Sequence, residues 1–203
     1  MQLILIRHGE TLWNKEGRVQ GTSDVELSAA GKKQADLLAL SLKDHPIESI
    51  HASPLKRAHQ TAEIINKFHH LDIQLHWDLM EMNQGDFEGF SFKELMASKK
   101  EFLQKWISDP TSVKMPNGES LSELQNRAWR ITEEIIGKSQ NALIVSHNFT
   151  IAAILCRLRN ISLSEFRSTC VDTASKTIIR LGKEKAIIDL LNDRSHLLEA
   201  RKK

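Results

Sequence analysis

The chain has 203 residues, and its 28 lysines and arginines nearly balance its 26 aspartates and glutamates, which leaves a net charge of +2. Such an even balance gives no support for a nucleic-acid-binding or membrane-surface protein. The length suits one domain with a sizeable hydrophobic core, so we expect a single domain over residues 1–203.

The cysteines and the N-terminal residues indicate in which cellular compartment the protein is expected. Cys156 and Cys170 lack the spacing of a metal site or a redox pair. The first apolar run is only four residues long, and no basic region precedes a long apolar segment, so we expect neither a signal peptide nor a membrane span. With two thiols that we expect to be reduced, a cytoplasmic protein is the simplest expectation.

The first predicted element is a buried strand over residues 3–6, with the sequence Leu-Ile-Leu-Ile. An unbroken apolar run of this length is typical of a parallel strand that is covered on both faces. Arg7 and His8 follow it directly. Because open α/β sheets bind ligands at the carboxyl ends of their strands, these two residues are candidates for a functional site.

Helices and strands then alternate along the chain. A helix is expected from the N-cap Ser28 to about Lys43, and a strand over residues 47–53. Ser53 and Pro54 have the residue types of an N-cap and a first helical position, which predicts a helix over about 55–68. A weaker strand is expected over 73–77.

The pattern changes between residues 82 and 118, where glycines and prolines surround one charged helical stretch over 93–106. We expect this stretch to be a lid-like insertion packed over one edge of the sheet. Ser120 and Glu123 then form a capping box for a helix to about Ile136.

The last predicted elements restore the alternation. They are a strand over 141–147, a helix near 150–159, and strands over 176–181 and 186–191. The whole order predicts an α/β fold: a three-layer sandwich with a mainly parallel central sheet and a helical lid insertion.

Three predicted strands lead into basic residues. His8 follows the first strand, Arg57 lies four residues after Ser53, and His147 ends the strand over 141–147. Strand ends of a parallel sheet that feed into helices share one edge. A helix N-terminus also attracts anions, and the arginine fork bonds two phosphate oxygens at once. This set of residues therefore predicts a phosphate pocket.

Four motifs in this order resemble the histidine phosphatase superfamily, in its phosphoglycerate mutase-like branch. They are "LIRHGETLWN", "SPLKRAHQTA", Glu81 followed by "GDFEG", and "IVSH". The resemblance covers about residues 3–153. It implies that His8 is a nucleophile that takes up the phosphoryl group, and that Glu81 protonates the leaving oxygen and later activates water.

The resemblance assigns the other site residues as well. Arg7, Arg57, Asn14 and His147 would hold the phosphoryl oxygens, and Gln20 and Gly21 would line the substrate side. Because cationic side chains supply the charge, it implies neither a metal nor a cofactor. The chain departs from many relatives at Asn148, where they carry glycine, and this side chain would add a polar group near the phosphate.

Several readings of the function stay open. A phosphatase of small phosphate monoesters is favoured over a phosphoglycerate mutase, because the stretch after Glu81 is shorter than the mutases carry. A protein phosphatase and a non-catalytic relative are weaker alternatives. Among small-molecule phosphatases, a specialised phosphoserine or α-ribazole enzyme is an alternative, although the phosphoserine enzymes are expected to carry a histidine near Gln84.

Other positions carry alternatives of their own. Glu88 competes with Glu81 for the role of acid, and His196 either reaches the pocket or lies on the surface. Phe90, Phe92 and Trp106 either select the substrate or form a small core of the insertion. The expected partner is a small phosphate ester, with neither nucleic acid nor membrane, and a homodimer is left open.

Overall fold

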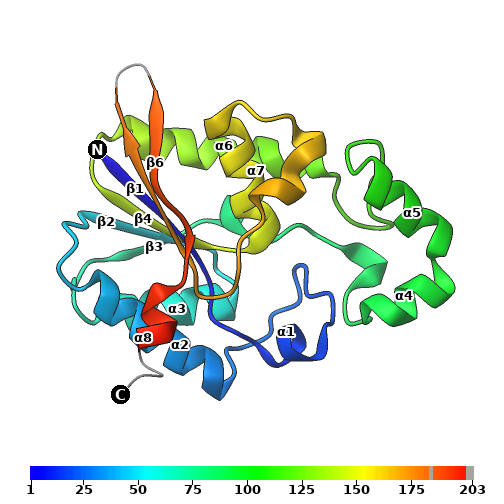
Figure 1. Ribbon diagram of the computed structural model, residues 1–203, viewed down its shortest axis with the longest axis horizontal. Coiled ribbons are helices and arrows are strands. Elements are labelled where there is room, and N and C mark those ends of the chain that lie inside the picture. Colours follow the sequence, from blue (N-terminus) through cyan, green and yellow to red (C-terminus); the bar gives the residue numbers. More distant parts are fainter. Residues whose placement is uncertain (183–184, 200–203) are drawn as a thin grey trace.

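The computed structural model describes residues 1–182 and 185–199, and its centre is a six-stranded sheet with the order β3-β2-β4-β1-β5-β6 (Figure 1). The strands are β1 (Gln2–Arg7), β2 (Ser49–Ala52), β3 (Ile73–Leu75), β4 (Ala142–Ser146), β5 (Lys176–Leu181) and β6 (Ala186–Asp193). The first four run parallel, and β5 and β6 join antiparallel at one edge. The prediction of a mainly parallel sheet is confirmed.

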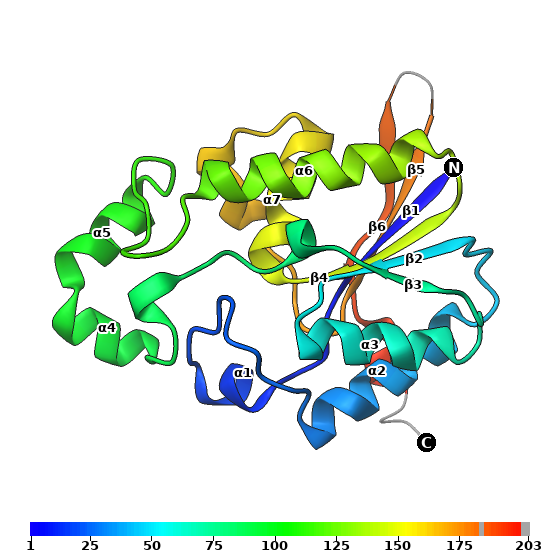
Figure 2. The ribbon, with the colours of Figure 1, turned by 180° about the vertical axis from the view of Figure 1, so that it is seen from behind.

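Helices cover both faces of this sheet (Figures 1 and 2). The long helices are α2 (Ala29–Leu42), α3 (Lys56–Asn66), α6 (Leu121–Gly137) and α7 (Asn148–Arg159), and the short ones are α1 (Leu12–Glu16), α4 (Phe92–Ser98), α5 (Lys100–Ser108) and α8 (Ser195–Glu199). Three 3-10 turns complete the chain: η1 (Trp77–Leu79), η2 (Gly85–Phe87) and η3 (Leu163–Thr169). The predicted three-layer arrangement is confirmed: α2 and α3 lie on one face, and α6 and α7 on the other.

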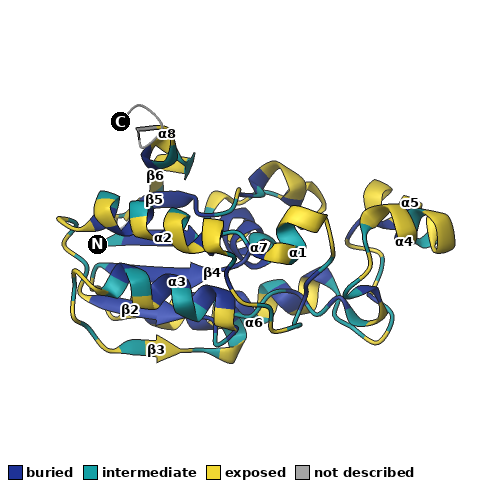
Figure 3. Ribbon diagram, turned by 90° about the horizontal axis from the view of Figure 1, so that it is seen from below, coloured by how far each residue is buried: buried dark blue, intermediate teal, exposed yellow. Residues whose placement is uncertain are grey.

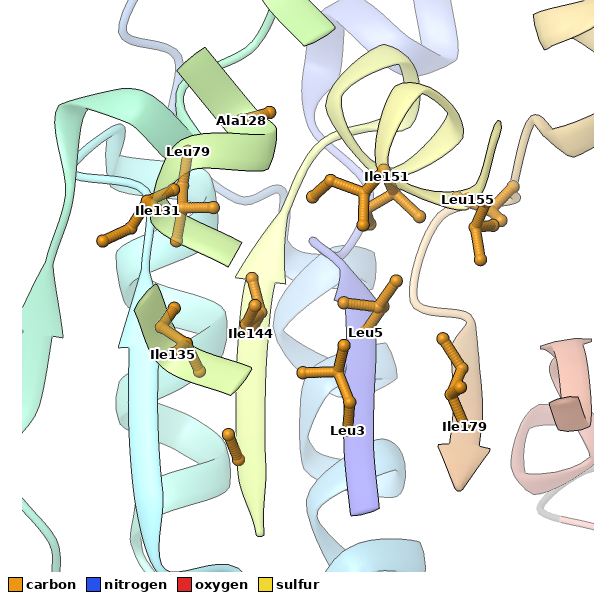
Figure 4. Close-up of a cluster of buried hydrophobic side chains, with 13 residues drawn as sticks. Leu3, Leu5, Leu79, Ala128, Ile131, Ile135, Ile144, Ile151, Leu155 and Ile179 are labelled. Atoms are coloured by element: carbon orange, nitrogen blue, oxygen red, sulfur yellow. The ribbon is translucent and has the colours of Figure 1, made fainter. Parts of the chain in front are cut away.

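The side chains of β1 alternate between the two faces of the sheet, and because they are apolar on both, helices must pack on both faces. Leu3 and Leu5 point into a cluster under α6 and α7, while Ile4 and Ile6 point into a second cluster under α2 and α3. Figure 4 shows the first cluster, in which β1 and Ile144 of β4 face α6 and α7. A strand that is apolar on both faces fits only between two helix layers.

The segment over 82–118 leaves the sheet and carries α4 and α5, which are mostly exposed (Figure 3). The prediction of one helix over 93–106 is wrong: the chain breaks at Lys99, whose φ of −133° and ψ of 32° are not helical. Neither glycine nor proline marks this break in the sequence. In the described part of the chain, no helix combines the length and apolarity that crossing a membrane requires.

Two further expectations need correction. Ser53 is not a helix N-cap, because α3 begins at Lys56 after Leu55, without a side-chain cap. His196 is 6% exposed and therefore not a surface residue, and it does not line the cavity described below.

Candidate active site

His8 directly follows β1, and its ring is 3% exposed. Its Nδ1 lies 2.7 Å from the carbonyl oxygen of Gly9. Because a carbonyl only accepts, Nδ1 carries the proton, and Nε2 keeps its lone pair. Burial, followed by the charges of Arg57 and Arg7, lowers the pKa of His8 well below its usual 6.5. The ring is therefore neutral near pH 7 and able to act as a nucleophile.

His147 lies beside His8, with 5.1 Å between the ring centroids. Its Nε2 is 2.8 Å from the Ser53 hydroxyl, which already accepts a hydrogen bond from the amide of Leu55. The hydroxyl can donate its hydrogen to Nε2 or accept a hydrogen bond from Nε2–H, so this contact is compatible with either ring tautomer. The Nδ1 atom of His147 is buried without a hydrogen-bond partner among the described residues. Burial and the charge of Arg57 lower the pKa of His147 well below 6.5.

Two arginines, one fully buried and one half-buried, carry the positive charge of the site. Arg57, in the first turn of α3, is fully buried and donates to the carbonyls of Gly21 (2.7 Å) and Ser23 (2.8 Å). Burial lowers its pKa to about 10, so it stays charged at neutral pH. Arg7 donates to the Val171 carbonyl.

Neither arginine forms a direct ion pair with a carboxylate of the described residues. Over residues 1–182 and 185–199, no ion pair to Arg7 or Arg57 occurs within 4.0 Å, and the Nε atoms of both lack a hydrogen-bond partner. Burying a guanidinium without a counter-charge is costly, and an anionic ligand offsets that cost. The arrangement is that of an anion site.

Glu81 lies in the loop between η1 and η2, opposite the start of α7. Its carboxylate accepts hydrogen bonds from the amides of Met82 (2.9 Å), Phe149 (3.2 Å) and Thr150 (3.3 Å). The last two are free amides of the first turn of α7, where a helix N-terminus stabilises negative charge. Glu88 occupies a different place: its carboxylate binds Thr22 and Ser23 and does not line the cavity.

Eight of the nine site residues expected from the sequence line one cavity of about 460 Å³. They are Arg7, His8, Asn14, Gln20, Gly21, Arg57, Glu81 and Asn148. His147 does not line it and is buried next to His8. Among the described residues, no three histidine, cysteine or acidic side chains are grouped as a metal ion requires.

Asn14, Gln20 and Gly21 also shape the loops that border the cavity. Asn14 forms a capping box with Thr11 at the start of α1, and the Thr11 hydroxyl donates to Gln20 (2.8 Å). Gly21 has a φ of +51°, and a Cβ there would lie 2.0 Å from a carboxylate oxygen of Glu88, so only glycine fits.

Asn148 is the first residue of α7, and its side chain both lines the cavity and binds a neighbouring loop. Its Oδ1 accepts from the amide of Val171 (2.8 Å), and the carbonyl of Val171 accepts from Arg7. The side chain that replaces the usual glycine thus supports the loop that holds Arg7.

The outer part of the cavity is apolar. Its lining there consists of Phe87, Phe92, Leu95, Leu103, Trp106, Ile107, Met115 and Phe149. Trp106, Phe149 and Phe166 pack together with centroid distances of 5.2 to 6.1 Å. Phe92 and Trp106 therefore face the cavity, whereas Phe90 is largely exposed outside it.

Some residues of the site were not anticipated. Ser53 contacts His147, and Thr150 and Phe149 contact Glu81, although these pairs are 94, 69 and 68 residues apart in the sequence. Arg18 and Arg167 line the cavity as well. No local pattern in the sequence marks such contacts.

Comparisons with known proteins show the family and the fold of the chain. The sequence model of the "Histidine phosphatase superfamily (branch 1)" matches residues 3–194. Phosphoserine phosphatase 1 of Hydrogenobacter thermophilus is 36% identical over 98% of this chain and 95% of its own. Among solved structures, Bacillus stearothermophilus YhfR matches with a TM-score of 0.90 and 28% identity over 97% of this chain and 98% of its own. The α-ribazole phosphatase of Shigella flexneri matches with a TM-score of 0.88 and 30% identity over 96% and 97%.

Proposed function

The chain belongs to the histidine phosphatase superfamily, and from that premise we propose that it hydrolyses small phosphate monoesters, without a metal, through a phosphohistidine on His8. One observation carries the proposal: a neutral imidazole with a free Nε2 lines a cavity together with two arginines, neither of which forms an ion pair with a carboxylate of the described residues. A phosphate group supplies both the electrophile and the missing negative charge.

In the first step, Nε2 of His8 forms a bond to phosphorus while the bond from phosphorus to the ester oxygen breaks. Arg7 and Arg57 stabilise the charge on the non-bridging oxygens, with Asn14 as a further donor, and the buried His147 ring packs beside His8. The Gly9 carbonyl, which accepts from Nδ1 of His8, stabilises the positive charge that develops on the imidazole ring.

Glu81 serves the leaving group. As the acid, Glu81 gives its proton to the departing oxygen while the bond from that oxygen to phosphorus breaks. The resulting carboxylate, held by the amides of Phe149 and Thr150, then takes a proton from the water that attacks phospho-His8. Inorganic phosphate leaves, and both residues return to their starting states.

The size and the lining of the cavity favour one class of substrate. A volume of about 460 Å³ lies within the range of pockets that hold ligands much larger than a phosphorylated three-carbon acid. Its lining is mainly aromatic and aliphatic, with Arg18 and Arg167 beside these residues, so burial of an apolar leaving group is favourable there. We therefore favour a phosphate ester with a sizeable apolar group over phosphoserine.

A rate survey without added metal tests this proposal. The panel holds p-nitrophenyl phosphate, 1-naphthyl phosphate, phosphoserine, α-ribazole phosphate and 3-phosphoglycerate, with wild type and His8→Ala. We expect His8-dependent release of phosphate, with the highest kcat/KM for the esters that carry apolar groups. Transfer from one phosphoglycerate to another, with little free phosphate, would instead establish the mutase alternative.

The proposal also covers the oligomeric state of the protein and its location in the cell. The edge strand β6 exposes Ile187, Leu190 and Leu191, which suits pairing with a second copy of this chain. We propose a homodimer through β6, which light scattering of wild type and Leu190→Lys tests. Cys156 and Cys170 are free thiols, as a cytoplasmic location requires.

A further inference from the structure

The backbone around Glu81 has no regular secondary structure to hold it. Residues 80–84 lie between η1 and η2, outside every helix and strand. A cavity of about 350 Å³ adjoins this loop, lined by Met80, Glu81, Asn83 and Glu119 among others, so the loop has room to shift. Contacts other than a hydrogen-bonded ladder must therefore hold the backbone that carries this carboxylate.

Arg127 of α6 supplies that support. Its Nη1 donates to the carbonyls of Asp78 and Met80, both at 2.8 Å, and its Nη2 donates to the carbonyl of Glu81 at 3.0 Å. One planar guanidinium thus donates hydrogen bonds to three backbone carbonyls of residues 78–81, the segment that ends at the proposed acid Glu81. A lysine ammonium cannot reproduce this fork.

Glu119 holds the guanidinium from the other side. Its carboxylate pairs with Arg127 in a bidentate fashion, with N–O distances of 2.7 and 2.9 Å, and both side chains are mostly buried. Glu119 also accepts from the amide of Asn83 at 3.1 Å, and its own amide donates to the Asn83 carbonyl at 2.9 Å. Arg127 and Glu119 therefore form hydrogen bonds with the loop both before Glu81, at Met80, and after it, at Asn83.

Arg127 lies in the long helix α6, and Glu119 lies just before its start. α6 begins with the capping box of Ser120 and Glu123, and its buried residues Leu121, Leu124 and Ala128 flank Arg127 in the sequence. Arg127 is thus fixed by packing, by Glu119 and by the carbonyls that it binds.

We infer that Arg127, together with Glu119, is a positioning residue for the acid–base Glu81 and thereby sets how well the enzyme cleaves esters with poor leaving groups. The inference rests on the proposed function. Displacing a catalytic group by about 1 Å costs up to about 10²-fold in rate. The loss is specific to the leaving group, because the phosphate is held by Arg7 and Arg57, which Arg127 does not contact.

The test compares kcat/KM for an alkyl phosphate and for p-nitrophenyl phosphate, whose leaving phenolate needs little protonation. kcat/KM reports the steps up to departure of the leaving group, so it separates protonation from the later hydrolysis of phospho-His8. For Arg127→Lys we expect a fall of about 10- to 100-fold on the alkyl ester and about 3-fold or less on p-nitrophenyl phosphate. Arg180→Lys, which alters an exposed bidentate pair with Asp189, is the matched control and should change neither.

Two further variants make the result decisive. In a Glu81→Gln background, Arg127→Lys should cause no additional loss of leaving-group selectivity. Should Arg127→Lys fail to fold, Glu119→Gln provides the same comparison. Equal losses on both esters in whichever variant folds would mean that the pair only stabilises the fold, and would overturn the inference. Failure of the proposed function gives a different pattern: wild type would then release no His8-dependent phosphate from either ester.

Discussion

The buried ring of His51 predicts a defined loss of stability in mild acid. His51 lies in β2, fully buried, with Nδ1 3.0 Å from Nε2 of His76 and Nε2 3.2 Å from the Ser49 hydroxyl. Burial, and then the charges of His76 and Lys138, lower its pKa from the usual 6.5 to about 4. Between these two values the unfolded chain binds a proton that the folded chain excludes, so stability falls as the pH falls.

The size of this loss follows from the two pKa values. Below pH 4 the full contribution is about 3 kcal/mol, and between pH 7 and pH 5 it is about 2 kcal/mol. Urea unfolding of wild type and His51→Gln at pH 7 and pH 5 measures it. The free energy of unfolding of the variant should fall by about 2 kcal/mol less than that of wild type.

Ser49→Ala is the matched control, because it removes a hydrogen bond of the ring but keeps the titrating group. It should lower stability at both pH values and retain most of the wild-type pH dependence. If His51→Gln loses as much stability between pH 7 and pH 5 as wild type does, the ring is not excluded from protonation, and the reasoning is refuted.

Three substitutions test the site. Glu81→Gln should lower kcat/KM for alkyl phosphates about 10²-fold or more, and for p-nitrophenyl phosphate far less; equal losses on both would sink the acid assignment. Ser53→Ala removes the partner of His147 Nε2, at a cost of about 1 to 2 kcal/mol, so kcat/KM should fall about 5- to 30-fold on every ester alike. Asn148→Gly frees the amide of Val171, whose carbonyl holds Arg7, so inhibition by inorganic phosphate should weaken about 5-fold or more. An unchanged inhibition constant would show that Asn148 does not support Arg7.

The sequence predicts most of the sheet because its signals are local. The apolar run of residues 3–6 by itself predicts a strand that is buried on both faces of the sheet. This run forms β1 as expected. The convergence of His8 and Arg57 follows from parallel strands that share one edge. The motifs that carried the family resemblance lie in these same segments.

Contacts between distant segments could not be predicted in this way. Arg127 binds carbonyls 46 to 49 residues away, and a helix surface looks the same in sequence whether its arginine meets solvent or a loop. The Ser53-Pro54 pair has the composition of a helix start, yet its hydroxyl contacts His147 across the sheet edge. At Ser53 a tertiary contact overrode the local preference, whereas at Arg127 no local preference existed to indicate the contact.

Direct detection of the phosphoenzyme tests the central claim. Glu81→Gln is mixed with p-nitrophenyl phosphate, whose leaving group departs without an acid, while loss of the base slows hydrolysis of the intermediate. The reaction is quenched in alkali, where phosphohistidine survives, and the site of modification is identified by mass spectrometry. The account predicts one phosphoryl group, on His8, and none in the double variant that also carries His8→Ala. A phosphoryl group on another residue, or turnover that persists in His8→Ala without any covalent intermediate, would contradict it.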